Sequence, residues 1–199
     1  SRRWRARLAG TVTPVPLDVA TTRSRLRVDR ERLRAWLQSH HQYQPPCLLF
    51  ESRYLCVWLQ RWSHWLHLRG HRGLARLMYH LNLMLTGADL PPQSDIGGGW
   101  LVTAPVALTV CGKAGSNFTI GALAGLGGEM SSSEDRGAGP GLPVLGDNVT
   151  IGTHGGVLGA VRIGNDVSIA PGCVVRKDVA DGSVVEAIGP RVRVSARPS

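Results

Sequence analysis

Few side chains in the C-terminal half of this 199-residue chain are suited to proton transfer or nucleophilic attack. His154 is the only histidine after residue 80, and imidazole is the side chain best suited to move protons near neutral pH. His154 is therefore a candidate general base, or else an ordinary corner residue or an obstruction in a ligand groove. Cys111 is a candidate nucleophile, although the sequence places no fixed base beside it. Asp89 could orient a base or cap the turn that begins at Asp89-Leu90-Pro91.

A six-residue period of apolar positions runs through the same half and indicates how these residues are held. An amphipathic helix repeats near 3.6 residues and a strand at 2, so neither explains a sustained period of six. The period predicts a parallel β-helix in which three hexapeptides make one triangular turn and residues eighteen apart stack. Residues 129–143 break the period and are rich in turn formers, which predicts a protruding loop between coils. The period is carried by Leu90, Ile96, Val102, Leu108, Ala114, Ile120 and Leu126, and then by Leu145, Ile151, Val157, Ile163, Ile169 and Val175.

The cysteines and histidines do not form a metal-binding pattern. The four cysteines, at positions 47, 56, 111 and 173, lack CxxC spacing, so we expect free thiols in a reducing compartment. A hydrolase that holds its metal with three histidines on neighbouring coils is nearly excluded, because the repeats contain one histidine. No metal and no bound cofactor are therefore predicted.

The N-terminal part is predicted to be helical. Residues 1–25 contain several helix breakers and are expected to form a loose arm. Asp29 is predicted to cap a helix that ends near residue 40, and two further helices are predicted over about 47–69 and 73–86. The apolar stripe of the second helix is expected to pack between helices or between subunits, and it includes Trp58, Trp62 and Trp65.

These segments predict an N-terminal arm and helical domain (1–87), a β-helix (88–189) and a basic tail (190–199). The formal net charge of +9 either keeps the surface hydrated or attracts an anionic ligand or partner. No nucleic-acid-binding motif is present, and no apolar run approaches the ~18 residues that cross a bilayer. The basic start is not followed by a secretory h-region, so we expect a cytoplasmic protein.

Three stretches resemble bacterial serine O-acetyltransferases and their relatives. Residues 89–100 (DLPPQSDIGGGW) are similar to the family's Asp-Ile-His-Pro segment followed by Ile-Gly-x-Gly. Residues 142–152 (LPVLGDNVTIG) are similar to the family's His-Pro-Lys-Ile-x-x-x-Val-x-Ile-Gly, and residues 186–191 resemble its Gly-x-Pro-Ala-Arg ending. The resemblance covers about residues 47–193. It implies a left-handed parallel β-helix after N-terminal helices, assembled as a homotrimer and potentially as a dimer of trimers.

The resemblance also implies a chemistry that this chain lacks in part. In such enzymes a histidine oriented by an aspartate takes the proton from the acceptor hydroxyl, and the alkoxide attacks the acetyl-CoA thioester. The match places the orienting aspartate at Asp89. It places the substrate-contacting aspartate and the catalytic histidine at Thr103 and Ala104, and a second histidine at Leu142. Both usual histidines are therefore missing.

The match further implies where the two substrates would lie. In relatives a glycine pair lies near the thioester, and the late coils with the tail line the coenzyme A groove. Arginine and lysine there could meet the phosphates of the ligand. The residues expected to contact the acyl donor are Gly127, Gly128, Gly155, Arg176, Lys177 and Arg191, and those expected to contact the acceptor are Thr103, Ala104 and Cys111.

Two functions are compatible with this pattern. The first is a diverged acyltransferase that moves an acyl group from coenzyme A, or from a carrier-protein thioester, to a small amine or hydroxyl acceptor. An amine needs less help from a base than a hydroxyl, and a preorganised site still supplies orientation. The alternative is a catalytically inactive homologue that acts as a scaffold or regulatory partner, which the loss of two histidines favours. Neither reading includes a nucleic-acid or membrane partner.

Overall fold

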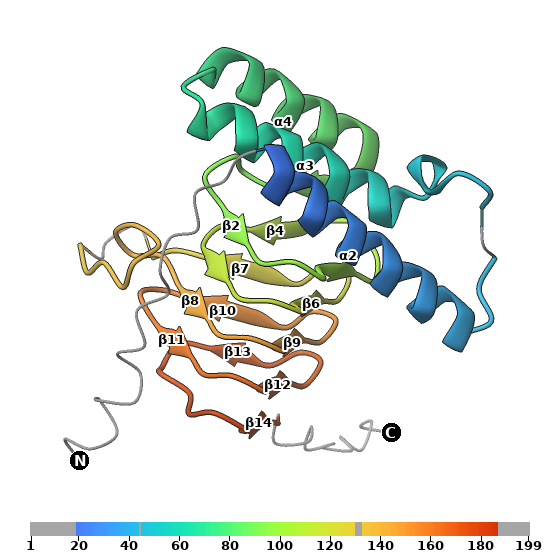
Figure 1. Cartoon of the computed structure of the whole chain (residues 1–199). Coiled ribbons are helices and arrows are strands. Elements are labelled where there is room, and N and C mark those ends of the chain that lie inside the picture. The colour runs from blue at the N-terminus through green and yellow to red at the C-terminus, as the bar shows by residue number, and fades with distance from the viewer. Residues whose placement is uncertain (1–18, 44, 130–132, 187–199) are drawn as a thin grey trace, which may run out of the picture.

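The computed structural model describes residues 19–43, 45–129 and 133–186. The helices of this part of the chain lie together over one end of a stack of short strands (Figure 1). They are α2 (Val19–Ser39), the short 3-10 helix η1 (Leu48–Phe50), α3 (Ser52–Leu68) and α4 (Arg72–Thr86). Among the described residues, none of the helices combines the length and the apolar character that a membrane crossing requires.

The first helix begins earlier than the sequence predicts. Residues 19–25, expected to belong to a loose arm, are helical, while residues 1–18 lie outside the described part. The prediction that Asp29 caps this helix is wrong, because Asp29 lies in the middle of α2 with its side chain buried. Its carboxylate is paired inside the protein with Arg61 of α3. The sequence pattern alone could not reveal that partner, which is 32 residues away.

The predicted second and third helices are confirmed. The third ends where expected because Gly87 adopts the left-handed conformation (φ 73°), which glycine reaches without a Cβ clash. The N–H group of Gly87 donates to the carbonyl oxygen of Leu83 (3.0 Å), which completes the last turn of α4. The chain then enters the first strand directly, so α4 stays close to the start of the β-helix (Figure 1).

Fourteen short strands in the described residues wind into a parallel β-helix with three faces. The first four coils contribute one strand to each face, the fifth contributes a strand to two faces, and neighbouring coils are hydrogen-bonded. We call the faces sheets A, B and C. Sheet A contains β1 (Ala88–Asp89), β4 (Leu108–Val110), β7 (Gly125–Gly127), β10 (Gly156–Leu158) and β13 (Val174–Val175); sheet B contains β2 (Asp95–Ile96), β5 (Lys113–Ala114), β8 (Val144–Leu145) and β11 (Arg162–Ile163); sheet C contains β3 (Leu101–Val102), β6 (Thr119–Ile120), β9 (Thr150–Ile151), β12 (Ser168–Ile169) and β14 (Val184–Val185).

The stacking of residues eighteen apart is confirmed for the regular coils. Thr150 of β9, for example, pairs with Ser168 of β12. The interrupting segment connects β7 to β8 and lengthens one turn, so that Lys113 pairs with Val144 instead. The segment protrudes beside the coils, as Figure 1 shows for its described part. Sheet A departs from the eighteen-residue spacing before the loop, because Ala88 pairs with Leu108 and Thr109 with Gly125.

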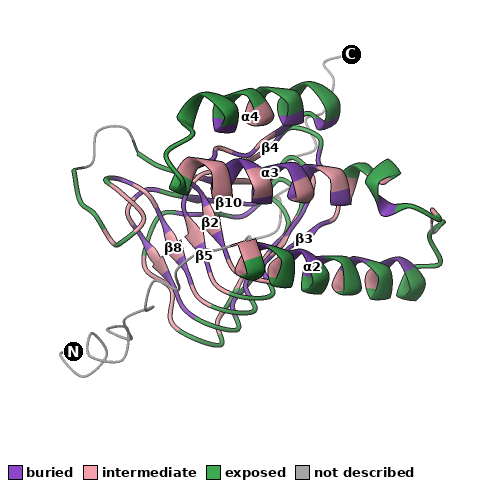
Figure 2. Ribbon diagram, turned by 45° about the horizontal axis from the view of Figure 1, so that its top comes forward, coloured by how far each residue is buried: buried purple, intermediate pink, exposed green. Residues whose placement is uncertain are grey.

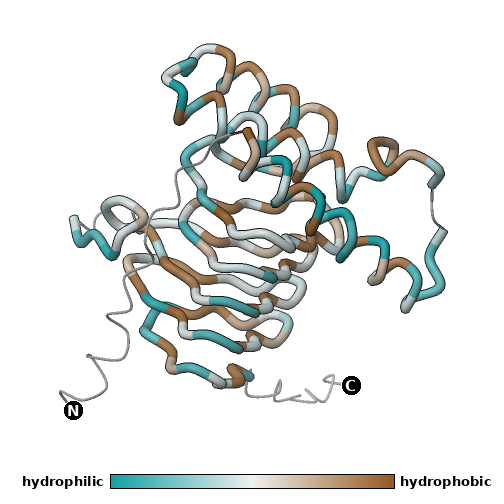
Figure 3. Tube along the Cα trace, in the orientation of Figure 1, coloured by the Kyte–Doolittle hydropathy of each residue, from teal (hydrophilic) through white to brown (hydrophobic). Residues whose placement is uncertain are grey.

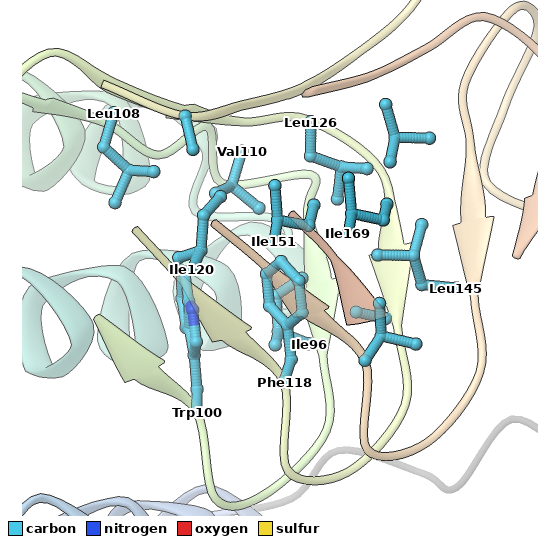
Figure 4. Packing of buried hydrophobic residues seen from close by; sticks show 14 of the residues in the cluster. Ile96, Trp100, Leu108, Val110, Phe118, Ile120, Leu126, Leu145, Ile151 and Ile169 are labelled. Atoms are coloured by element: carbon cyan, nitrogen blue, oxygen red, sulfur yellow. The ribbon is translucent and has the colours of Figure 1, made fainter. Parts of the chain in front are cut away.

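The apolar residues of the six-residue period fill the inside of the β-helix (Figure 4). Every one of them is at most 7% exposed, and the buried positions follow the inner side of each coil (Figure 2). Near the helical end, Trp100 stacks on Phe118 with ring centroids 6.5 Å apart. Burying an aliphatic or aromatic side chain of this size contributes about 1.5–3 kcal/mol. The period thus has its physical origin in a core that is one side chain deep per strand.

Side chains from α2 and α3 cover the open end of the β-helix. Strands β1, β2 and β3 are edges of their sheets, so carbonyl oxygens in the first coil have no neighbouring strand to bond. Leaving such a group buried and unpaired costs about 1–3 kcal/mol. Helix side chains supply the missing donors: Arg25 bonds to the carbonyl oxygen of Ile96 (3.0 Å), Arg32 to that of Gly99, and Gln60 to that of Ser94 (2.9 Å).

The ion pair between Arg61 and Asp29 lies at the centre of this cover, with both side chains no more than 2% exposed. Arg61 donates from Nε to Asp29 Oδ2 (3.0 Å) and from Nη2 to Asp29 Oδ1 (3.2 Å). The same guanidinium donates to the carbonyl oxygens of Ile96 and Gly97, the latter at 2.6 Å. Asp29 Oδ1 also accepts the backbone N–H of Trp100 (2.7 Å). One buried pair therefore joins α2, α3 and the first coil.

Replacing Arg61 with methionine should strongly destabilise the fold. The Arg61→Met change leaves the buried Asp29 carboxylate without its counter-charge, and breaking such a pair costs about 3–5 kcal/mol. Urea denaturation gives the free energy of unfolding, with Arg30→Met, an exposed arginine on the same helix as Asp29, as control. The double variant Asp29→Leu/Arg61→Met should recover part of the loss. A cost below about 1 kcal/mol for Arg61→Met would contradict this account.

The buried imidazole of His64 predicts that stability depends on pH. His64 lies on α3 with Nδ1 2.6 Å from the carbonyl oxygen of Pro92 and Nε2 3.7 Å from Asp95 Oδ1. Burial lowers the pKa of His64 by more than the contacts with Pro92 and Asp95 raise it. Below about pH 6.5 the unfolded chain thus binds a proton that the folded protein resists. Folding stability should therefore fall as the pH drops from about 6.5 toward the lower folded pKa.

Urea titrations between about pH 7.5 and 5 measure this slope. We expect His64→Gln to flatten it, because the variant removes the titrating group while keeping a donor for Pro92. His71→Gln, at an exposed position, serves as the control and should leave the slope unchanged. Parallel pH curves for the wild type and His64→Gln would show that another group causes the dependence.

Candidate functional site

Two polar side chains from different parts of the chain meet at the outer face of sheet A. Asp89 ends β1, and its half-buried side chain points away from the core because its neighbours Ala88 and Leu90 are fully buried. Tyr79 comes from α4 and donates a hydrogen bond from Oη to Asp89 Oδ1 (2.9 Å). Burial raises the pKa of Tyr79, and the bond to Asp89 raises it further. The hydroxyl therefore keeps its proton, and the carboxylate is the acceptor.

Cys111 lies beside this pair on the same face. It follows β4, whose Thr109 is the register partner of Asp89, and its thiol is half-buried. Burial raises the pKa of Cys111 and the charge of Asp89 raises it further, while a hydrogen bond with the Ser94 side chain offsets part of the increase. Because the thiolate is the reactive form, this environment disfavours Cys111 as a nucleophile. Cys111 therefore borders the candidate site without acting as its nucleophile.

Thr103 and Ala104, which the sequence match places at the family's aspartate and catalytic histidine, follow strand β3 and are half-buried. Thr103 donates its backbone N–H (3.0 Å) and its hydroxyl (3.4 Å) to the carbonyl oxygen of Ile120. Ala104 has no polar side-chain atom. Within the described part of the chain, no imidazole forms a hydrogen bond or ion pair with Asp89. The site of one chain therefore holds a carboxylate without a histidine beside it.

His154 lies at a corner between sheets C and A, away from Asp89. Its backbone is left-handed (φ 57°), its N–H donates to the carbonyl oxygen of Ala122 (3.0 Å), and its side chain is exposed. Ala107 and Leu123 adopt the same conformation at the equivalent corners, so the corner explains the backbone of His154 without a catalytic role. The strand after His154 lies three strands beyond β1 in sheet A, a separation of about 14 Å. The two side chains therefore do not form a pair within one chain.

The outer face of sheet A carries little side-chain bulk two strands away from Asp89, beyond Thr109 of β4. Strand β7 has glycine at both outward positions, Gly125 and Gly127, while Leu126 points into the core. A Cβ atom at Gly125 would meet nothing within 4 Å, and one at Gly127 would meet only Leu158 Cδ2 at 3.9 Å. Packing within the chain therefore requires glycine at neither position. Glycine in a strand interior often marks the close approach of a ligand or of another backbone.

Gly128 and Gly155, in contrast, lie close to other atoms of the chain. A Cβ atom at Gly155 would lie 2.8 Å from the carbonyl oxygen of Gly152, a distance that real Cβ atoms essentially never show. A Cβ atom at Gly128 would lie 2.8 Å from Cδ2 of Leu142, the residue that the sequence match places at the family's second histidine, but the end of a leucine side chain can move aside. Contacts inside the chain thus explain Gly155 whether or not a ligand binds.

Charged side chains of both signs gather at the far end of the same face. Outward positions in register across sheet A run from Cys111 through Gly127 and the exposed Leu158 to Arg176, and Lys177 follows. Arg176 and Lys177 are exposed and line an open hollow of about 430 Å³ beside the loop between β7 and β8. Arg176 Nη2 lies 3.5 Å from Glu129 Oε1 across this hollow. Arg191, also expected to contact the donor, lies outside the described residues.

No metal centre is visible in the part of the chain that the structure describes. Among residues 19–43, 45–129 and 133–186, no three histidine, cysteine, aspartate or glutamate side chains lie close enough to share an ion. All four cysteines are free thiols.

Sequence reasoning missed Tyr79, the partner of Asp89. Only its position carries a signal: Tyr79 lies on the same side of α4 as the buried Ala75, Asn82 and Thr86. The chain passes from this helix through Gly87 into Asp89 within three residues, so a polar residue on that side could have been expected near the carboxylate. The apolar pattern drew attention to the opposite side of the helix instead.

No protein-family model matches this chain, and no curated protein matches it in sequence. Solved structures do match. A serine acetyltransferase isoform 3 from Entamoeba histolytica, solved with cysteine, has a TM-score of 0.73 at 19% identity over 89% of this chain and 62% of its own. The Neisseria gonorrhoeae serine acetyltransferase gives 0.72 at 24% identity, over 85% and 66%. The soybean apoenzyme gives 0.70 at 26% identity, over 83% and 66%.

The chain therefore has a serine acetyltransferase-like fold. The predicted fold class, a left-handed parallel β-helix of hexapeptide repeats after an α-helical N-terminal part, is confirmed. The chain spans 62% to 66% of the length of these three structures.

Proposed function

We propose that this protein transfers an acyl group from coenzyme A, or from a carrier-protein thioester, to a small amine or hydroxyl acceptor at the outer face of sheet A. The observation that carries the proposal is the Asp89 carboxylate, which Tyr79 holds two strands away from β7, a strand with no outward side chains. A proton acceptor on the same face as a bare stretch of backbone suits a reaction in which a flat thioester lies along the sheet. The serine acetyltransferase-like fold supports the same class of reaction.

The proposed donor site follows the outward positions of sheet A. The phosphates of coenzyme A would meet Arg176 and Lys177, whose exposed cations suit phosphate oxygens. The linear pantetheine arm would lie over Gly127, where its thioester could approach the backbone closely. From β13 back to β1 this path crosses four strand spacings, about 19 Å. The acceptor would lie at the other end, between Asp89 and Cys111.

The proposed reaction needs no cofactor beyond the thioester. The acceptor nitrogen or oxygen attacks the carbonyl carbon of the thioester, and the new C–N or C–O bond forms as the C–S bond breaks. Coenzyme A leaves as a thiolate and gains the proton that the acceptor loses, so the products are the acylated acceptor and free coenzyme A. A neutral amine attacks without prior deprotonation, whereas a hydroxyl needs a strong base at that moment. The absence of a histidine beside Asp89 therefore favours an amine.

His154 acts on the same acceptor only if another subunit brings it to Asp89, because within one chain the strand after His154 lies about 14 Å from β1. This requirement fits the proposed homotrimer, in which faces of neighbouring β-helices lie against each other. The His154→Asn variant tests the role without disturbing the corner, since asparagine tolerates the left-handed conformation that Asn148 adopts at another corner.

The proposal predicts first that the chain binds the donor. Isothermal titration of the whole chain with coenzyme A and with acetyl-CoA should give affinities near micromolar, about −8 kcal/mol. Release of free thiol should follow when acetyl-CoA is mixed with a panel of small acceptors that includes ethanolamine and L-serine. Asp89→Asn should lower that turnover by about 100-fold or more while leaving the affinity for coenzyme A unchanged.

Asp166→Asn is the matched control, because Asp166 is an exposed corner residue at a type of position where Asn148 also occurs. Full turnover in Asp89→Asn would show that Asp89 takes no part in the reaction. Absence of binding to either nucleotide would leave a carrier-protein thioester as donor, or favour the inactive scaffold. Loss of turnover without loss of binding in His154→Asn would assign the base to a second subunit.

One observation points to a contact surface on the helices, which the second candidate function, a scaffold, would also require. The outer side of α4 is apolar and exposed, as the brown positions along this helix in Figure 3 show. The tryptophans from which the sequence predicted such a surface are partly buried, and Trp58 and Trp62 pack against the core of the helical part. The exposed apolar side chains of α4 are Leu74, Leu77, Leu81, Leu83, Met84 and Leu85.

We propose that a second copy of the chain covers this side of α4 and joins two trimers. The double variant Leu77→Asp/Leu81→Asp should therefore halve the mass measured by light scattering, because it places charges in an apolar contact. Val28→Asp, at an exposed apolar position on α2, is the control. An unchanged mass in the α4 variant would show that the assembly contact lies on another surface. A monomeric wild type would contradict both the trimer and a site shared between subunits.

A further inference from the structure

The hydroxyl of Tyr79 is held in place by a helix that is itself anchored on both sides of it. Ser63 of α3 donates from Oγ to the carbonyl oxygen of Ala75 (2.7 Å), one turn before Tyr79. Asn82, nearly one turn after it, donates from Nδ2 to the carbonyl oxygen of Cys56 (2.9 Å). Both contacts are buried. Tyr79 therefore reaches Asp89 from a rigid support rather than from a loop.

The bond that Tyr79 makes leaves one carboxylate oxygen of Asp89 available. The hydroxyl donates to Oδ1 (2.9 Å), and Oδ2 has no hydrogen-bond partner among the described residues. A donor that occupies one oxygen fixes the plane of the carboxylate and the direction of the other oxygen's lone pairs. The half-buried position of Asp89 keeps that second oxygen reachable from the outer face of sheet A.

We infer that Tyr79 is a positioning residue of the acceptor site, which fixes Asp89 so that Oδ2 binds an N–H group of a primary amine. The inference rests on the proposed acyl transfer and names its acceptor class. A rigid carboxylate with one free oxygen recognises an N–H donor by direction as well as by charge. Cys111, neutral and adjacent, borders the space in which the amine would lie.

The step that this arrangement assists transfers the acyl group to the amine and one proton to the leaving thiolate. The amine nitrogen attacks the thioester carbon while one of its hydrogens is bound to Asp89 Oδ2. As the C–N bond forms and the C–S bond breaks, that proton passes to Oδ2 and then to the departing thiolate sulfur. The carboxylate is regenerated, and the products are an amide and free coenzyme A. Tyr79 exchanges no proton in this step and serves only to hold Oδ1.

The thiol of Cys111 reports on this arrangement without any turnover. Its rate of alkylation by iodoacetamide depends on its thiolate fraction, which the charge of Asp89 lowers. The measurement is made in the Cys47→Ser protein, because Cys47 is exposed and would react as well. Peptide mass spectrometry identifies Cys111 as the alkylated residue over a range of pH.

We expect Asp89→Asn to accelerate alkylation of Cys111 at mildly alkaline pH. We expect Tyr79→Phe to change the rate by at least about twofold, and to change nothing further in the Asp89→Asn background. Tyr43→Phe is the matched control, since Tyr43 is 77% exposed. A Tyr79→Phe profile identical to that of the wild type, or an effect that persists in the Asp89→Asn background, would overturn the role of Tyr79.

Kinetics with acetyl-CoA and ethanolamine supply the second readout. A positioning role predicts that Tyr79→Phe lowers kcat/KM for ethanolamine by about tenfold, the usual effect of losing one hydrogen bond to a charged group, while KM for acetyl-CoA stays unchanged. A KM for acetyl-CoA that rises as much as kcat/KM for ethanolamine falls would point to a damaged fold instead and reject the inference. A wild type that releases no coenzyme A refutes the proposed function, and the alkylation profiles still decide whether Tyr79 positions Asp89.

Discussion

The buried pair of Arg61 and Asp29 is the interaction on which the rest of this structure depends. A β-helix has an open end whose carbonyl oxygens lack a neighbouring strand, and here Arg61 supplies donors to two of them. A bare guanidinium could not be buried there without a counter-charge, which Asp29 provides. The pair thus fixes α2 and α3 on the first coil, and α4 is bonded to α3. Through α4, it also determines where Tyr79 meets Asp89.

The β-helix could be predicted from the sequence because its core repeats one local rule. Each short strand sends at least one apolar side chain inward, and strands of two or three residues follow one another at nearly constant intervals, so burial recurs every six residues. The cover of the open end obeys no such rule. Asp29 has the residue type of a helix cap, and only its contact with Arg61 on another helix explains why it lies inside α2. Pairings of this kind are set in three dimensions and leave no period in the chain.

The candidate site also has residues that the sequence predicts and a contact that it does not predict. Asp89 was predicted because it lies in a motif, and Cys111 lies near it because the strands are in register. Tyr79 belongs to a helix whose apolar residues dominate its pattern, and its contact depends on how α4 settles on the first coil. His154 illustrates the opposite error. Its residue type attracts a catalytic interpretation, but its left-handed backbone is a property that Ala107 and Leu123 share at the equivalent corners.

A rigid coil changes what a carboxylate can do without a histidine. In a flexible site, a lone carboxylate would lose orientation to solvent, and its weak basicity would leave little advantage over water. Here Asp89 is attached to a hydrogen-bonded strand and held by a tyrosine on an anchored helix. The outward glycines of β7 let a thioester approach without side-chain obstruction. Such a site contributes mostly placement, which suffices for an acceptor that is already nucleophilic and fails for one that must first be ionised. For the proposed acyl transfer, a carboxylate without a histidine beside it would therefore restrict the acceptor chemistry without ruling out the reaction.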